Sequence, residues 1–377
     1  MRRTSVLLLA LVLLMVLAAL PALAATADYE PPQGQVLTLQ KAIDLALRYD
    51  KNLQKAAAEV ERTKELREDA AKKIDFTPAP GSSYEPTTEL NWNNLLSADL
   101  NWRMSKKNLE ATRDALVLKV CQSYWNTQTA QEKVALQEKL EQQALLKLQN
   151  ARAGAQAGTV SPSQVVLAES QWQQAKNNLE AARHDLEDAY VSLNQLIGLR
   201  SEERPLLTDN PAFEPLDVVD LEHEVARVVA SSPSVWLAQQ TVTLKEWAAD
   251  MMFFTGQYNP YKARQIAVDQ AELDAASAAD LMELVTRNLY YAARGLEESY
   301  RAATEALQMA QENLRVVQVK YDAGMAIKAD IQAAEVAVAQ AEQAVNALKR
   351  QHAYVKLAFE KPWAASAGSG GTSGAGS

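Results

Sequence analysis

An internal duplication constrains the fold of this chain more than any other feature of its sequence. When the 377-residue sequence is shifted by 166 positions, Gly158 falls on Gly324. The alignment has no gap between its outermost matched pairs, which are Tyr124 with Tyr290 and Ala175 with Ala341. A repeat of this kind predicts two copies of one structural unit that pack against each other.

The beginning of each copy follows a different offset. Residues 39–53 resemble residues 221–235, which lie 182 positions further along the chain. Because the later parts of the copies are only 166 positions apart, the second copy lacks 16 residues between its first and second long helices. We therefore place the first repeat at residues 36–210 and the second repeat at residues 211–363.

Each copy carries the pattern of a long coiled-coil hairpin. Residues 261–361 contain no proline, which leaves room for two long helices. Two rows of apolar residues recur every seven positions in the first copy, namely Val165, Trp172, Leu179, Leu186, Leu193 and Ala168, Ala175, Ala182, Ala189. Such rows form the seam of a coiled coil. We predict an all-α-dominated fold of long coiled-coil hairpins in two tandem repeats, with Gly158 and Gly324 at the turns.

The helical pattern stops between the first two long helices. Several proline and glycine residues precede a stretch in which polar and apolar residues alternate, and this alternation predicts a short β-hairpin near residues 84–103. Its candidate membrane-facing residues are Leu90, Trp92, Leu100 and Trp102. The equivalent region of the second copy, near residues 251–261, is a shorter strand region. Its aromatic residues beside Gly and Pro suit a contact with a membrane surface, and a buried turn between two helices explains them at least as well.

The two ends of the chain differ from the repeats. Arg2 and Arg3 precede an apolar run and then a string of small residues, which predicts a secretory signal peptide at residues 1–24 in preference to a membrane anchor. No later stretch has the roughly twenty apolar residues of a membrane-spanning helix, so any membrane crossing would use strands. Residues 364–377 are mainly Gly, Ser, Ala and Thr, and we predict that they are disordered.

The composition and the reactive residues argue against catalysis and against nucleic acid as a partner. The net charge is −9, which gives no attraction to phosphate backbones. Cys121 is the only cysteine, and its place in a helical pattern predicts a buried apolar role. His184, His223 and His352 show no ligand spacing, so we predict surface residues, no metal site, no cofactor and no enzyme activity.

Two motifs and their order resemble the TolC-like outer membrane efflux family. The segment 37–47, LTLQKAIDLAL, is similar to the start of the family's first repeat, and Tyr321-Asp322-Ala323-Gly324 followed by Asp330-Ile331 is similar to the turn that closes its second repeat. The resemblance covers roughly residues 36–361. It implies a homotrimer whose helices form a hollow α-barrel in the cell envelope, reaching from the outer membrane into the periplasm.

The resemblance also implies a function and a constriction site. Members of the family are passive export ducts that work with a periplasmic adaptor and an inner membrane transporter. Tyr321 and Asp330 match the tyrosine and the first acidic ring of the family's iris, while Ala326 stands where the family has a base, which Lys328 could replace. Asp330 is equally well explained as a solvated residue that favours a helix N-terminus. A non-conducting coiled-coil spacer of the cell envelope is the alternative function.

Overall fold

The computed structural model describes residues 36–74, 86–250 and 261–369. The predicted signal peptide at residues 1–24 lies outside these ranges. So does the reduced strand region of the second copy, except for Tyr261, which begins a helix. Within the described residues, no helix combines the length and the apolar character needed to cross a membrane.

The described elements fall into two sets that follow the two repeats. The first set is β1 (Val36–Leu37), α2 (Leu39–Tyr49), α3 (Lys51–Lys72), α4 (Pro86–Gln156), α5 (Pro162–Ile197) and β2 (Leu206–Leu207). The second set is α6 (Leu221–Ser231), α7 (Pro233–Asp250), α8 (Tyr261–Asp322), α9 (Lys328–Glu360) and the short α10 (Pro362–Ser369).

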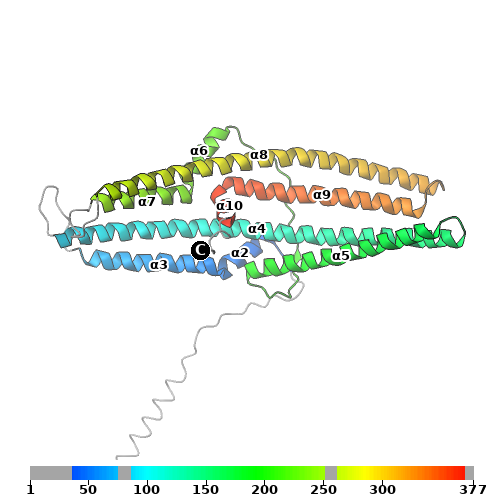
Figure 1. The fold of residues 1–377 in the computed structure, drawn as a ribbon, viewed down its shortest axis with the longest axis horizontal. Coiled ribbons are helices and arrows are strands. Elements are labelled where there is room, and N and C mark those ends of the chain that lie inside the picture. Colours follow the sequence, from blue (N-terminus) through cyan, green and yellow to red (C-terminus); the bar gives the residue numbers. More distant parts are fainter. Residues whose placement is uncertain (1–35, 75–85, 251–260, 370–377) are drawn as a thin grey trace, which may run out of the picture.

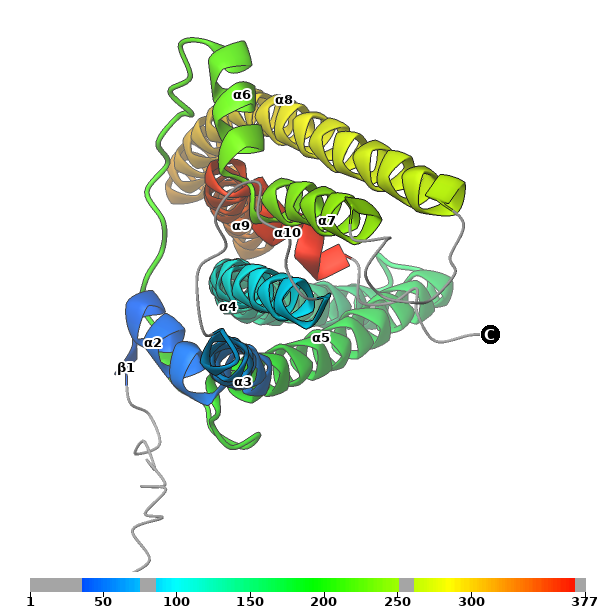
Figure 2. The ribbon, with the colours of Figure 1, turned by 90° about the vertical axis from the view of Figure 1, so that its left-hand side faces the viewer.

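The helices are arranged as two long hairpins that lie side by side. In each repeat one long helix, α4 or α8, runs along most of the molecule, with α3 and α5 beside α4 and with α7 and α9 beside α8 (Figure 1). Viewed from the end, α4 lies between α3 and the second repeat, and α9 is its neighbour across the repeat boundary (Figure 2). The predicted fold of tandem long helical hairpins is confirmed.

The helix boundaries reproduce the two offsets of the sequence. The ends of α4 and α8, at residues 156 and 322, and the starts of α5 and α9, at residues 162 and 328, are 166 positions apart. The starts of α2 and α6, at residues 39 and 221, and of α3 and α7, at residues 51 and 233, are 182 positions apart. The duplication therefore extends from the sequence to the individual helices.

Local signals account for the breaks between helices. Gly158 and Gly324 have φ angles of 72° and 73°, a left-handed conformation that glycine adopts without the steric cost of a Cβ atom. Ser161 then caps α5, because its Oγ accepts from Gln164 N at 3.4 Å while its own N–H donates to Gln164 Oε1 at 3.2 Å. Both glycines thus lie in the turns where we predicted them.

The largest core of the first repeat lies where β1, α2, α4 and α5 meet. Tyr124 on α4 is fully buried there, and its hydroxyl donates to Leu37 O at 2.7 Å. The same oxygen accepts from Thr208 N and Asp209 N, at 3.1 and 3.2 Å. This one side chain therefore ties α4 to the two short parallel strands, in which Leu37 pairs with Leu207.

The predicted β-hairpin near residues 84–103 is wrong, because residues 86–103 form the beginning of α4. Leu90, Trp92, Leu100 and Trp102 are therefore helical and not strand residues. All the proline and glycine residues of this region precede residue 87, so nothing interrupts the helix beyond them. Contacts with α3 stabilise this part of the helix: Arg67 Nε donates to Asp99 Oδ1 at 2.6 Å, and the hydroxyls of Thr63 and Ser105 lie 2.8 Å apart.

The predicted disorder of residues 364–377 is wrong at its beginning. Residues 362–369 form α10, and Ala364 is buried. Pro362 suits the first turn of a helix, where a missing N–H costs nothing. Trp363 packs into a cluster that includes Leu118 of the first repeat and Met282 of the second, so α10 fills space between the repeats. Residues 370–377 lie outside the described ranges.

Candidate functional site

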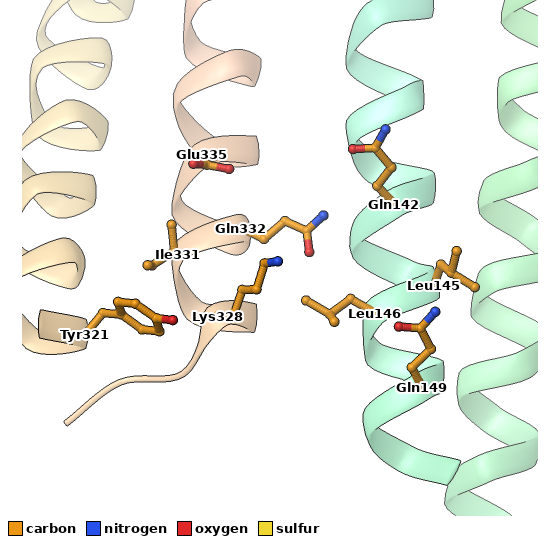
Figure 3. A pocket seen from close by; sticks show the side chains of 9 residues that line it. All are labelled: Gln142, Leu145, Leu146, Gln149, Tyr321, Lys328, Ile331, Gln332 and Glu335. Carbon is orange, nitrogen blue, oxygen red and sulfur yellow. The ribbon is translucent and has the colours of Figure 1, made fainter. Parts of the chain in front are cut away.

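A groove runs between α4 and α9, on the boundary between the two repeats. At the turn end it opens into a cavity of about 520 Å³. The cavity is lined by Gln142, Leu145, Leu146 and Gln149 of α4, and by Tyr321, Lys328, Ile331, Gln332 and Glu335 of the second hairpin. Figure 3 shows that Lys328 and Gln332 extend from α9 toward α4, where Leu146 faces them.

The groove continues toward the middle of the molecule. A second cavity, of about 140 Å³, lies between the same helices and is lined by Glu132, Ala135, Leu136, Lys139, Ala339, Glu342, Gln343 and Asn346. In both cavities each helix contributes residues at spacings of three, four and seven, which is the stripe that one face of a helix presents. The groove therefore has the periodicity of an open coiled-coil seam.

Arg350 joins the two repeats at the inner end of the groove. Its Nη1 donates to Glu132 Oε2 on α4 at 2.9 Å and to Thr129 Oγ1 at 3.2 Å, and its Nε donates to Asn210 Oδ1 at 3.2 Å. Asn346 Nδ2 donates to the second carboxylate oxygen of Glu132, at 3.2 Å. The guanidinium is thus held by α4 and by the segment that connects the repeats.

The predicted constriction residues divide between two places. Tyr321 and Lys328 both line the turn-end cavity. Asp330 is exposed, is not one of the residues that line this cavity, and accepts a hydrogen bond from Ile327 N through Oδ2 at 2.9 Å. This carboxylate therefore stabilises the start of α9, as the helix dipole favours. This contact does not test whether Asp330 lines the opening of a pore, so that role stays a proposal.

Sequence reasoning missed the α4 side of the groove. Gln142, Leu145, Leu146 and Gln149 lie in the middle of a long helix, and only their spacing could have drawn attention to them. The groove combines apolar side chains with amides and with charges of both signs, Lys328 and Glu335, so it suits a packed helix better than a small reactive molecule. Among the described residues, no group of three or more His, Cys, Asp or Glu side chains is placed to hold a metal ion.

The comparisons with known proteins agree with this architecture. Residues 91–199, which cover most of α4 and all of α5, match the family described as outer membrane efflux protein. No curated protein sequence matches the chain.

Several solved structures share its fold at low sequence identity. The Campylobacter jejuni CmeC outer membrane channel is 14% identical, with a TM-score of 0.64 over 88% of this chain and 89% of that chain. A membrane protein from Pseudomonas aeruginosa is 16% identical, with a TM-score of 0.63 over 85% and 89%. The outer membrane protein VceC from Vibrio cholerae is 11% identical, with a TM-score of 0.62 over 85% and 94%. The chain has the fold of the TolC-like proteins, and its segment 91–199 resembles the outer membrane efflux proteins.

Proposed function

We propose that this chain is one protomer of a homotrimeric efflux duct of the outer membrane and periplasm. The duct is passive and does no chemistry, and its substrate moves through the lumen of an α-barrel. It docks to a periplasmic adaptor and serves an inner membrane transporter. The match to outer membrane efflux proteins and the tandem hairpins support the general class of this proposal.

The observation that carries the proposal is that α8 has two opposite apolar faces. One face is buried within the chain and includes Ala271, Met282 and Ala293. The other is a row of large apolar residues that are between 46% and 69% exposed: Ile266, Leu273, Leu284, Tyr291 and Met309. At 3.6 residues per turn the row stays on one side of the helix, about half a turn from the buried face.

Two opposite contact faces are what a helix needs in the wall of a tube. A helix at the edge of a solid bundle packs on one side only and keeps polar residues on the other. In a wall, each helix has a neighbour on both sides. The exposed row of α8 is therefore proposed to pack against the first repeat of the next protomer, which closes the ring.

The turn end of this duct would carry its constriction. Tyr321 lies in the last turn of α8, and Lys328 and Asp330 lie in the first turn of α9, so a threefold axis at this end would bring three copies of each together. Three carboxylates around a narrow opening favour cations. We therefore propose that Asp330 contributes to ion selectivity in addition to its contact with Ile327 N.

Reconstitution of the purified protein in planar bilayers tests the duct. We expect trimers that give discrete conductance steps with a preference for cations, and we expect Asp330→Asn to reduce that preference. Leu284→Glu places a charge in the proposed seam and is expected to weaken trimer formation at least tenfold, since burying an unpaired carboxylate is costly. Multi-angle light scattering measures the oligomeric state.

Leu281→Glu is the matched control. Leu281 is an exposed leucine on the same helix, but it lies about 60–80° around the helix from the row, so the same substitution there should leave the trimer intact. A non-conducting monomer or dimer of the unmodified protein would refute the duct. Equal effects of the two substitutions would refute the proposed seam.

We propose that a helix of the adaptor packs into the α4–α9 groove. Its heptad spacing favours this mode of binding. A photo-crosslinking side chain at Gln332, inside the groove, is expected to capture a periplasmic protein that contains a long helical hairpin. The same probe at the exposed Leu167 of α5, outside the residues that line the groove, should give little of that product. Equal capture at both positions would exclude the groove as the docking site.

A structural spacer remains the second candidate function, and one observation favours it. Residues 86–103, where we expected membrane-facing strands, form the beginning of α4. A coiled-coil spacer needs only the helices. Reconstitution separates the two functions, because a spacer gives no conductance whatever its oligomeric state.

A further inference from the structure

The segment that connects the repeats crosses the second hairpin as a strap. We define the strap as residues 208–219, between β2 and the N-cap residue of α6. Near its start Asn210 accepts from Arg350, and further along Lys356 Nζ of α9 donates to Glu214 at 3.1 Å. Leu216 is buried against Ala293 of α8 and Phe359 of α9. The strap is therefore attached to both helices of the second hairpin.

A buried carboxylate holds the backbone of the strap. Glu297 of α8 is 4% exposed, and its Oε1 accepts from Leu216 N at 2.7 Å. Its other oxygen, Oε2, accepts from Arg294 Nη1 at 2.8 Å. Burial acts to raise the pKa of Glu297, but the hydrogen bonds from Leu216 and Arg294 and the charge of Arg294 outweigh it, so the pKa is lowered. Glu297 is therefore ionised at neutral pH.

A buried histidine faces the same carboxylate, so the prediction that His352 is a surface residue is wrong. His352 of α9 is 2% exposed, and its Nε2 lies 3.5 Å from Glu297 Oε1. Phe213 of the strap covers the imidazole at a centroid distance of 4.8 Å and stacks on Tyr300 of α8 at 3.7 Å. Burial lowers the pKa of His352 despite the contact with Glu297, so the imidazole is neutral at neutral pH.

We propose that Glu297 and His352 form an acid-sensitive clasp that holds the strap on α8 and α9 and releases it when the pH falls. The other charged groups that face the pair are Arg294 on α8 and Lys356 on α9, with Glu214 on the strap paired to Lys356. The clasp does not depend on the chain being a duct. It makes the connection between the repeats, and hence the second hairpin, responsive to the acidity of the compartment.

The two lowered pKa values determine the direction in which the stability of the clasp changes with pH. In the open state His352 is solvated and titrates near its ordinary pKa of about 6.5, and Glu297 near about 4.3. Both groups bind protons more weakly in the closed state, so the open state takes up protons first as the pH falls. The clasp is complete above about pH 6.5, and its stability is lost progressively below it. If opening takes up one proton, its equilibrium constant rises about tenfold for each unit by which the pH falls.

Amide hydrogen exchange of strap peptides between pH 7.5 and 5.0 tests the clasp in the full-length protein. After correction for intrinsic rates, we expect protection of the Leu216 amide to fall by up to tenfold per unit below about pH 6.5. His352→Gln should abolish this decrease in the range above pH 5. His184→Gln is the matched control, because His184 is exposed on α5, and it should behave like the unmodified protein.

Two results would overturn the proposal. One is constant protection of the strap across the pH range, and the other is a pH dependence that persists in His352→Gln. If that variant does not fold, exchange of the imidazole C2 proton in the unmodified protein decides. The clasp requires the pKa of His352 to lie below the ordinary value of about 6.5, and a value at or above it would exclude the clasp.

Discussion

Arg350→Ala is expected to lower the free energy of unfolding by about 3–5 kcal/mol, because it removes one partner of a buried ion pair and leaves the other without its countercharge. The Arg350 side chain is 6% exposed and that of Glu132 is 30% exposed, which favours the lower end of this range. The substitution also removes the donors to Thr129 and Asn210. Chemical denaturation followed by helical circular dichroism measures the change.

Two further variants distinguish the loss of this buried ion pair from the loss of a positive charge anywhere on the protein. Arg315→Ala removes an ion pair with Glu312 on the surface of α8, where both side chains are more than half exposed, and such pairs contribute about 0–1 kcal/mol. Arg350→Lys keeps the charge but cannot reach Glu132, Thr129 and Asn210 together, so its effect should be intermediate. Our account fails if Arg350→Ala is no more destabilising than Arg315→Ala.

The position of Arg350 explains why sequence patterns revealed the hairpins but not what joins them. Within each repeat, heptad rows and turn glycines act over a few residues, and they predicted the helices of both copies. The partners of Arg350 are far away in the sequence: Glu132 is separated from it by 218 residues and Asn210 by 140. Contacts between residues so far apart in the sequence depend on how the two hairpins pack against each other. The spacing of apolar residues within one hairpin does not predict that packing.

The same reasoning explains the incorrect assignment of His352. We expected this residue at the surface, because the three histidines show no ligand spacing. Its burial depends on the strap, whose Phe213 covers the ring. The strap has little regular structure of its own, so no periodic signal predicts where it crosses α9.

The error at residues 86–103 has a different cause. Leu90 and Trp92, like Leu100 and Trp102, are two positions apart, which suits a strand, but Leu96 and Leu100 are four apart, which suits a helix. Short apolar patterns of this kind fit both structures. Packing against α3 decides between them, through Asp99 and Ser105, and α3 lies across a break in the helical pattern.

The prediction of disorder from residue 364 onward considered only the small residues of this segment and not the tryptophan just before it. Trp363 directly precedes the run of small residues, and we placed it at the end of the second repeat. It packs with Leu118, Val235 and Met282, and its Nε1 donates to Asp114 Oδ2 at 3.0 Å. Lys361 Nζ donates to the other oxygen of Asp114 at 2.6 Å. The end of the chain is thus attached to α4 of the first repeat.

Trp363→Ala is accordingly expected to lower the free energy of unfolding by about 3–5 kcal/mol, the cost of removing a buried aromatic side chain. Trp363→Phe keeps most of the packing and loses the hydrogen bond to Asp114, so it should cost much less than the alanine variant. The denaturation midpoints of the two variants test this order. If Trp363→Ala unfolds at the same denaturant concentration as the unmodified protein, α10 does not stabilise the boundary between the repeats. If the two variants are equally destabilised, the contribution of Trp363 comes from Asp114 and not from its burial between the hairpins.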